Sequence, residues 1–187
     1  MTPGNHDFSY GSDRLVELSF HTPVPMLSAN CIKKGTDKKL LDGYAIVQRE
    51  SIRIGVFGLS TPETAYKTNP ANVTTVEFYD PYTAAAEAVS ILKAAEVDYI
   101  VALCHLGLNS SSLYTSEGLA KAVADIDLIV DGHSHTLLEQ GKRVGNTLIV
   151  SAGEYMGAVG AVTLDHATRS ATAAGIKAGD SRLQGLS

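Results

Sequence analysis

Short apolar runs alternate with longer amphipathic stretches along this chain of 187 residues. The runs at 44–48 and 52–58 are separated by Glu50-Ser51, which predicts two strands joined by a tight turn. The full set of predicted strands is 25–32, 44–48, 52–58, 73–78, 99–103, 128–130, 147–150 and 158–164. Because helical patterns lie between several of these strands, the order predicts an α/β fold.

Helical spacing of apolar residues occurs at 12–19, from residue 80 onward, and at 116–124. The clearest helix opens with Asp80-Pro81, where the aspartate can cap the first turn and proline suits the first position. Its apolar stripe comprises Ala85, Ala88, Val89 and Leu92. Residues 33–39 predict a charged surface loop, and the weak patterning of 174–187 predicts a poorly ordered tail.

Composition and charge narrow the possible functions. Apolar residues make up 44% and charged residues 19% of the chain, which is typical of one soluble globular domain. A net charge of −5 argues against an extended nucleic-acid groove, which needs a basic surface, so no nucleic-acid partner is expected. An acidic protein can still bind phosphate esters when metal ions supply the positive charge.

The sequence has no membrane span and no signal-peptide pattern at its N-terminus, and we leave its cellular location open. Its two cysteines form no CxxC pair, and Cys104 lies in an apolar run that predicts burial.

Three polar clusters stand at the chain start or directly after predicted strands. They are Gly4-Asn5-His6-Asp7, Cys104-His105-Leu106-Gly107 and Gly132-His133-Ser134-His135, and they contain four of the six histidines. In α/β folds the loops beyond the carboxyl ends of strands converge on one edge, where ligands bind. We therefore expect His6, His105, His133 and His135 to lie near one another.

These residue types suit a metal site. Neutral imidazole is the commonest nitrogen ligand for divalent transition metals, and an asparagine oxygen suits harder ions. Two histidines one residue apart, as at His133 and His135, can reach two neighbouring ions from one loop. A single histidine after a strand is more often structural, so the hypothesis depends on the three clusters occurring together.

The blocks 4–8, 102–107 and 131–136 resemble three successive signature blocks of the calcineurin-like metallophosphoesterases. The similarity is greatest to the 5′-nucleotidase and 2′,3′-cyclic-nucleotide phosphodiesterase branch, with further matches at 25–30, 55–64 and 152–155, and it extends to about residue 165. The resemblance implies that residues 1–187 are one partial catalytic domain with an uncertain tail. It also implies an α/β sandwich of two mixed sheets flanked by helices, here lacking its first strands.

The resemblance also implies roles for individual residues. Asn5, His105 and His133 correspond to ligands of one metal, and His135 corresponds to a ligand of the other. His6 corresponds to the histidine that contacts the scissile phosphate and stabilises the transition state or protonates the leaving oxygen. The implied reaction is hydrolysis of phosphate esters, chiefly nucleotides, by water activated by two divalent ions of the Zn, Mn, Fe or Co type.

The chain departs from the family pattern in ways that weaken the prediction of activity. The family places an Asp-x-His block and a bridging Gly-Asp block before Gly-Asn-His, and this sequence has neither, so we expect at most one well-held ion and little or no two-metal catalysis. Met1-Thr2 resembles an internal segment of the family, so we expect the chain to begin at an internal methionine. Ser9 stands where the family has an aspartate that supports the catalytic histidine.

Three other hypotheses remain open. The chain could be a non-catalytic fragment that binds one ion, an inert fragment, or a thiosulfate-ester hydrolase of the same superfamily, which shares these blocks. Family members often work outside the cytoplasm, and many carry a second domain that binds the nucleobase. If strands of the sheet are missing, apolar sheet edges are exposed. We therefore expect either a homo-oligomer formed through such an edge or a chain that is only marginally stable.

Overall fold

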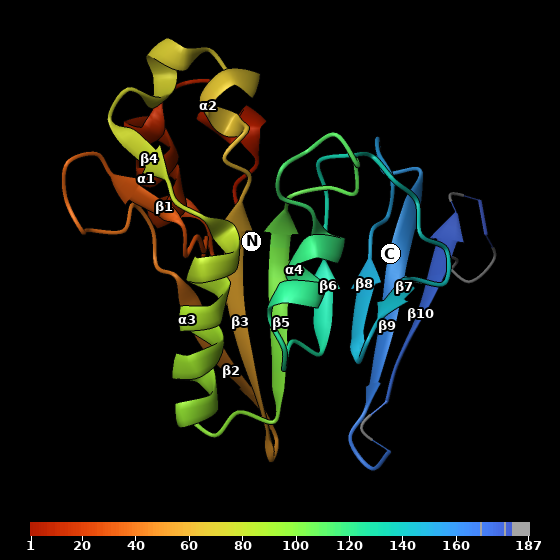
Figure 1. Cartoon of the computed structure of the whole chain (residues 1–187). Coiled ribbons are helices and arrows are strands. Elements are labelled where there is room, and N and C mark those ends of the chain that lie inside the picture. The colour runs from red at the N-terminus through yellow and green to blue at the C-terminus, as the bar shows by residue number, and fades with distance from the viewer. Residues whose placement is uncertain (169, 178, 181–187) are drawn as a thin grey trace.

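A mixed six-stranded sheet forms the centre of the computed structural model, which describes residues 1–168, 170–177 and 179–180 (Figure 1). Its strands, in spatial order, are β2 (Tyr44–Arg49), β3 (Ile52–Ser60), β5 (Tyr99–His105), β6 (Leu128–Val130), β8 (Thr147–Val150) and β7 (Lys142–Val144). The four inner strands run parallel, and the outer strands β2 and β7 run antiparallel to their neighbours. The carboxyl ends of the inner strands therefore meet at one edge of the sheet.

Helices α3 (Pro81–Ala94) and α4 (Ser116–Ala122) cover one face of this sheet (Figure 1). The predicted stripe of α3, Ala85, Ala88, Val89 and Leu92, is buried in the core between helix and sheet. Asp80 caps α3, because its carboxylate accepts hydrogen bonds from the N–H groups of Tyr82 and Thr83 at 2.8 and 3.0 Å. The predicted start of this helix is confirmed.

The opposite face of the sheet packs against an antiparallel hairpin of β9 (Ala158–Asp165) and β10 (Ser170–Lys177). Val162 and Leu164 of β9 and Ala171 of β10 contact the apolar cluster formed by Val101 and Leu128 of the sheet. The hairpin is the described part of a second sheet layer, so the predicted α/β sandwich is confirmed. The predicted disorder of 174–187 is wrong for residues 174–177, which lie in β10, and residues 181–187 lie outside the described part of the chain.

A smaller unit lies above the carboxyl edge of β3 and includes the N-terminal segment (Figure 1). Its elements are η1 (Asn5–Phe8), α1 (Ser12–His21), β1 (Cys31–Lys33), α2 (Thr64–Lys67), η2 (Pro70–Val73) and β4 (Val76–Phe78). β1 pairs antiparallel with β4, and Phe8 packs edge-on against Phe78 with ring centroids 5.4 Å apart. This packing fixes the N-terminal segment against the β1–β4 pair.

The predicted strand at 25–32 is wrong, because regular pairing begins only at Cys31. The preceding backbone amides donate to two different neighbours: Ser28 to the carbonyl of Asp42, and Ala29 to that of Gly58. This pattern cannot build a continuous ladder. The predicted strand at 73–78 is shortened to β4, since η2 takes up residues 70–73.

The remaining predicted elements are confirmed to within a few residues. Strands 44–48, 52–58, 99–103, 128–130, 147–150 and 158–164 correspond to β2, β3, β5, β6, β8 and β9, and the helices at 12–19 and 116–124 correspond to α1 and α4. None of the helices in the described residues combines the length and apolarity that crossing a membrane requires.

A buried amide at Asn30 holds the end of β3, and the N-terminal segment is bonded to that end through Ser60. The Nδ2 group of Asn30 donates to the carbonyl of Ser60 at 2.8 Å and to that of Tyr79 at 3.2 Å, and its Oδ1 accepts the N–H of Ser60 at 2.9 Å. The hydroxyl of Ser60 in turn donates to the carbonyl of Pro3 at 2.9 Å. These bonds place Gly4 and Asn5 beside the carboxyl edge of the sheet.

Replacing Asn30 by alanine is expected to lower the free energy of unfolding by about 2–4 kcal/mol, because it leaves buried backbone groups of Ser60 and Tyr79 without their partner. Urea denaturation followed by circular dichroism measures the change. Asn109→Ala, at an exposed loop position, is the matched control and should stay within about 0.5 kcal/mol of the unchanged protein. Equal losses in the two variants would contradict the role given to Asn30.

Candidate functional site

Three side-chain donor atoms from distant parts of the chain meet at the carboxyl edge of the sheet. The Nε2 atom of His105 lies 3.0 Å from Oδ1 of Asn5, and Nδ1 of His133 lies 3.2 Å from the same oxygen. The two ring nitrogens are 3.1 Å apart. The three atoms thus form a nearly equilateral triangle, although 100 residues separate Asn5 from His105 and 28 separate His105 from His133.

The fold explains how each member reaches this place. Asn5 is the first residue of η1, His105 is the last residue of β5, and His133 follows β6 in a loop where its φ angle is +75°. The carboxylate of Asp131 links the two loops, since its Oδ1 accepts the N–H groups of Leu106 and Gly107, both at 3.1 Å. Asp131 therefore sets the distance between the loop that carries His105 and the loop that carries His133.

Gly4 leaves the space that the imidazole of His105 occupies. A Cβ atom at Gly4 would lie 2.5 Å from Cε1 of this ring, which is closer than any ordinary contact. Gly107 adopts a φ of +81°, which favours glycine, and lets the chain after His105 turn toward the loop of His133. Steric constraints at the site thus explain why glycine stands at position 4 in the first cluster and at position 107 in the second.

The site favours neutral imidazoles. Burial, with smaller contributions from the charges of His133, His6 and His135, lowers the pKa of His105 to about 4. His105 is therefore neutral near pH 7, and its Nε2 can act as a donor to a cation. Burial also raises the pKa of Asp131, against the opposing effect of the hydrogen bonds that its carboxylate accepts.

The chemistry of these donors fits one divalent ion. In a tetrahedral site with bonds of about 2.1 Å, neighbouring donor atoms are about 3.4 Å apart, so a triangle of 3.0–3.2 Å needs only slight widening. Within the described residues no group of three or more His, Cys, Asp or Glu side chains could hold an ion, and here the third donor is the amide oxygen of Asn5. Two imidazoles and an amide leave further coordination positions open.

The other two predicted site residues lie outside this triangle. His135 is 59% exposed, and its Nδ1 lies 2.5 Å from Oε2 of Glu154. His6 is exposed at the start of η1, near enough for its charge to affect the pKa of His105. Asp7 accepts the N–H of Gly4 at 2.7 Å, so its carboxylate caps the turn of its own segment.

Glu63 lies inside the block 55–64 that resembles the family, although the sequence assigned it no role, and it contacts His133 at one corner of the triangle. Its Oε2 is 3.2 Å from Nε2 of His133, the ring nitrogen on the side away from Asn5 and His105. Glu63 follows the carboxyl end of β3 and immediately precedes α2. Its place after a predicted strand was the available signal, but a single glutamate there does not point to a histidine 70 residues away.

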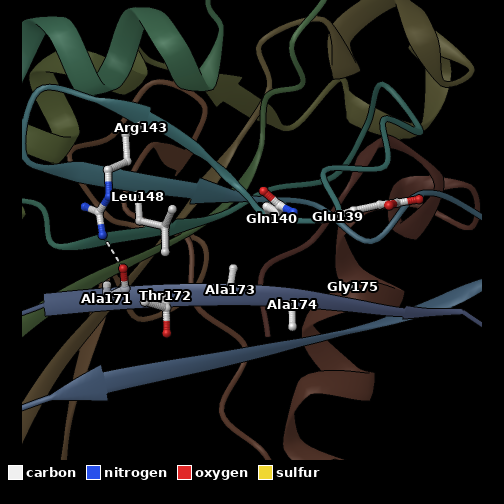
Figure 2. Close-up of a pocket in the computed structure, with 9 residues that line it drawn as sticks. All are labelled: Glu139, Gln140, Arg143, Leu148, Ala171, Thr172, Ala173, Ala174 and Gly175. Carbon is white, nitrogen blue, oxygen red and sulfur yellow. Dashed lines mark hydrogen bonds between the residues drawn. The ribbon is translucent and has the colours of Figure 1, made fainter. Parts of the chain in front are cut away.

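A cavity lies elsewhere in the molecule, away from the triangle. It has a volume of about 510 Å³ and lies between β10 and the segment around β7 and β8 (Figure 2). Arg143 donates a hydrogen bond to the carbonyl of Ala171 across it, and Glu139 at its other end pairs with Lys177. Its described lining residues include neither histidine nor cysteine, so we look for the chemistry at the triangle instead.

Comparison with known proteins points to one family. Residues 1–137 match the calcineurin-like phosphoesterases. A curated 5′-nucleotidase of Vibrio parahaemolyticus is 36% identical over 148 residues, which are 72% of this chain and 25% of that protein. The chain therefore spans about a quarter of the length of this relative.

Solved structures show the same fold. A 5′-nucleotidase precursor of Thermus thermophilus superposes with a TM-score of 0.79 at 32% identity, over 95% of this chain and 38% of that one. The sulfate thiohydrolase SoxB of the same organism superposes with a TM-score of 0.85 at 24% identity, over 95% of this chain and 32% of that one. At this lower identity, the second likeness concerns the fold alone.

The low pKa of His105 predicts a loss of stability in mild acid for the metal-free protein. Unfolding returns the pKa from about 4 to 6.5, so the unfolded chain binds more protons between these values. The free energy of unfolding is therefore independent of the protonation of His105 above pH 6.5. It decreases as the pH falls from 6.5 toward 4, by about 3 kcal/mol in total.

Urea denaturation in the presence of a chelator, at several pH values from about 7.5 to 4.5, measures this loss. His105→Gln should show a shallower dependence on pH, and His21→Gln, at an exposed histidine of α1, should keep the dependence of the unchanged protein. If the free energy of unfolding depended on pH in the same way in all three proteins, the pKa of His105 would not be lowered in the folded chain.

Proposed function

The chain belongs to the calcineurin-like phosphoesterase family of hydrolases, and we propose that it forms part of a metal-dependent phosphoesterase that acts on nucleotides. The observation that carries this proposal is the triangle of Asn5 Oδ1, His105 Nε2 and His133 Nδ1, with sides of 3.0–3.2 Å. We assign these three residues as ligands of one divalent ion of the Zn, Mn, Fe or Co type.

The names of relatives support the substrate class. A curated relative at 36% identity and a solved structure at 32% identity both carry the name 5′-nucleotidase. We propose a nucleotide or another small phosphate ester as the substrate of the whole protein. The net charge of −5 agrees with a site in which a cation, and not a basic surface, attracts the phosphate.

We assign separate roles in the reaction to a bound cation and to the residues around the triangle. A divalent cation bound here supplies Lewis acidity that favours attack on phosphorus. Exposed His6, beside the ligands, contacts the phosphate and donates a proton to the leaving oxygen. Ser9 brings no negative charge to stabilise the protonated form of His6, so its acid function is weaker than a neighbouring carboxylate would make it.

A second candidate function is the binding of one metal ion without catalysis. The donor triangle serves a single ion, and His135, the residue assigned to a second ion, pairs with Glu154 instead. A site for two ions needs further ligands and a group that bridges them. For this chain by itself, we therefore propose one bound ion and little or no hydrolysis.

We further propose that the chain self-associates through the open edge of β2. Tyr44, Ile46 and Val47 are each 38–39% exposed on this outer strand, and an apolar edge strand favours pairing with a second copy. Sedimentation velocity over a range of concentrations should show a dimer that Val47→Lys shifts toward monomer. A stable, compact monomer at every concentration would contradict this proposal.

Titration of chelator-treated protein with Mn²⁺, Co²⁺ or Zn²⁺ is expected to show one bound equivalent by calorimetry. His133→Ala removes one of three ligands and should weaken binding at least tenfold, roughly 1.4 kcal/mol. His21→Ala, at an exposed histidine at the end of α1, serves as the control. Unchanged affinity in His133→Ala would exclude the proposed ligand set.

The same samples decide between the two candidate functions. With one equivalent of metal, hydrolysis of a chromogenic phosphate ester and of a nucleoside monophosphate is expected to stay near background. Hydrolysis well above background that disappears in His133→Ala would establish catalysis by this chain and reject the purely binding function.

A further inference from the structure

Glu63 contacts the candidate metal site from outside the ligand triangle. Its carboxylate oxygen Oε2 lies 3.2 Å from Nε2 of His133, and the side chains of His133 and Glu63 are only 8% and 14% exposed. The opposite ring nitrogen, Nδ1, faces Asn5 and His105 at 3.2 and 3.1 Å. The imidazole of His133 therefore stands between a carboxylate on one side and the ligand triangle on the other.

This arrangement selects one form of the imidazole. A neutral imidazole has a single N–H group and a single nitrogen lone pair, while a carboxylate only accepts hydrogen bonds. If Nε2 donates its hydrogen to Glu63, the lone pair is on Nδ1. Nδ1 is the atom of His133 that forms one corner of the triangle, and a metal ligand must present a lone pair there.

Several contacts fix Glu63 in this position. Its backbone N–H donates to the hydroxyl of Thr61 at 3.2 Å, and its carbonyl accepts the N–H of Lys67 at 2.7 Å in the turn of α2. Glu63 is thus an acceptor held on a short, internally bonded turn.

We propose that Glu63 is a positioning residue, which holds the hydrogen of His133 on Nε2 and so keeps Nδ1 available as a metal ligand. The effect on metal affinity rests on the proposed function, because it requires that the triangle binds an ion. The effect on the tautomer of His133 rests on the geometry of the metal-free chain alone. The two parts can therefore be measured separately.

The first experiment reads the tautomer directly. Long-range ¹H–¹⁵N correlation spectra of the ¹⁵N-histidine-labelled, chelated full chain at about pH 8 identify which nitrogen of each imidazole carries the hydrogen. We expect Nε2–H for His133. In Glu63→Ala the Nδ1–H form should increase, because Oδ1 of Asn5 remains as an acceptor at 3.2 Å. Glu63→Gln should be intermediate, since a carboxamide can accept from Nε2–H or donate to Nε2.

The second experiment measures affinity. Calorimetry with Zn²⁺ and the visible absorption spectrum of the Co²⁺-loaded chain should show affinity reduced roughly 10- to 100-fold in Glu63→Ala and less in Glu63→Gln. Glu17→Ala, at an exposed glutamate of α1 that pairs with Arg14, is the matched control and should bind like the unchanged protein. Urea denaturation of each variant checks that it is folded.

The outcomes separate this inference from the proposed function. An Nδ1–H tautomer in the unchanged protein would overturn the inference without any variant. An unchanged tautomer and affinity in folded Glu63→Ala would overturn it while leaving metal binding intact. If the tautomer responds to Glu63 as expected but no protein binds metal, the positioning of His133 is supported and the proposed function fails.

Discussion

The parallel pairing of β3, β5 and β6 is the constraint that brings the candidate site together. Because these strands run in one direction, their carboxyl ends reach the same edge, and the register places Ser60 beside His105. Asn30 holds the backbone of Ser60, and the hydroxyl of Ser60 donates to the carbonyl of Pro3 in the N-terminal segment. Asp131 links the loop after β5 to the loop after β6. The three donor atoms meet only because each of these connections is made.

Burial gives this site its chemical character. Removing His105 from water lowers its pKa to about 4, so the ring is a neutral donor across the physiological range. Glu63, a carboxylate that contacts the cluster, lies against His133 on the far side of the ring. A group placed in this way fixes the orientation and the tautomer of an imidazole.

A shared fold does not determine which substrate a protein acts on. The structure with the TM-score of 0.85 is a sulfate thiohydrolase, whereas the one with the higher identity of 32% is a 5′-nucleotidase precursor. The same fold thus occurs in proteins named for different substrates, and it does not select between them.

Local sequence patterns were enough to predict the α/β order, the cap of α3 at Asp80 and the candidate ligands Asn5, His105 and His133, because periodicity and short motifs are local properties of a chain. The prediction failed at 25–32, where the hydrogen-bond partners of the backbone lie on two different segments. The contacts of Glu63 with His133 and of Glu154 with His135 emerge only in the folded chain. Such pairs depend on how separate loops are brought together, and no local pattern of apolar and polar residues encodes that distance.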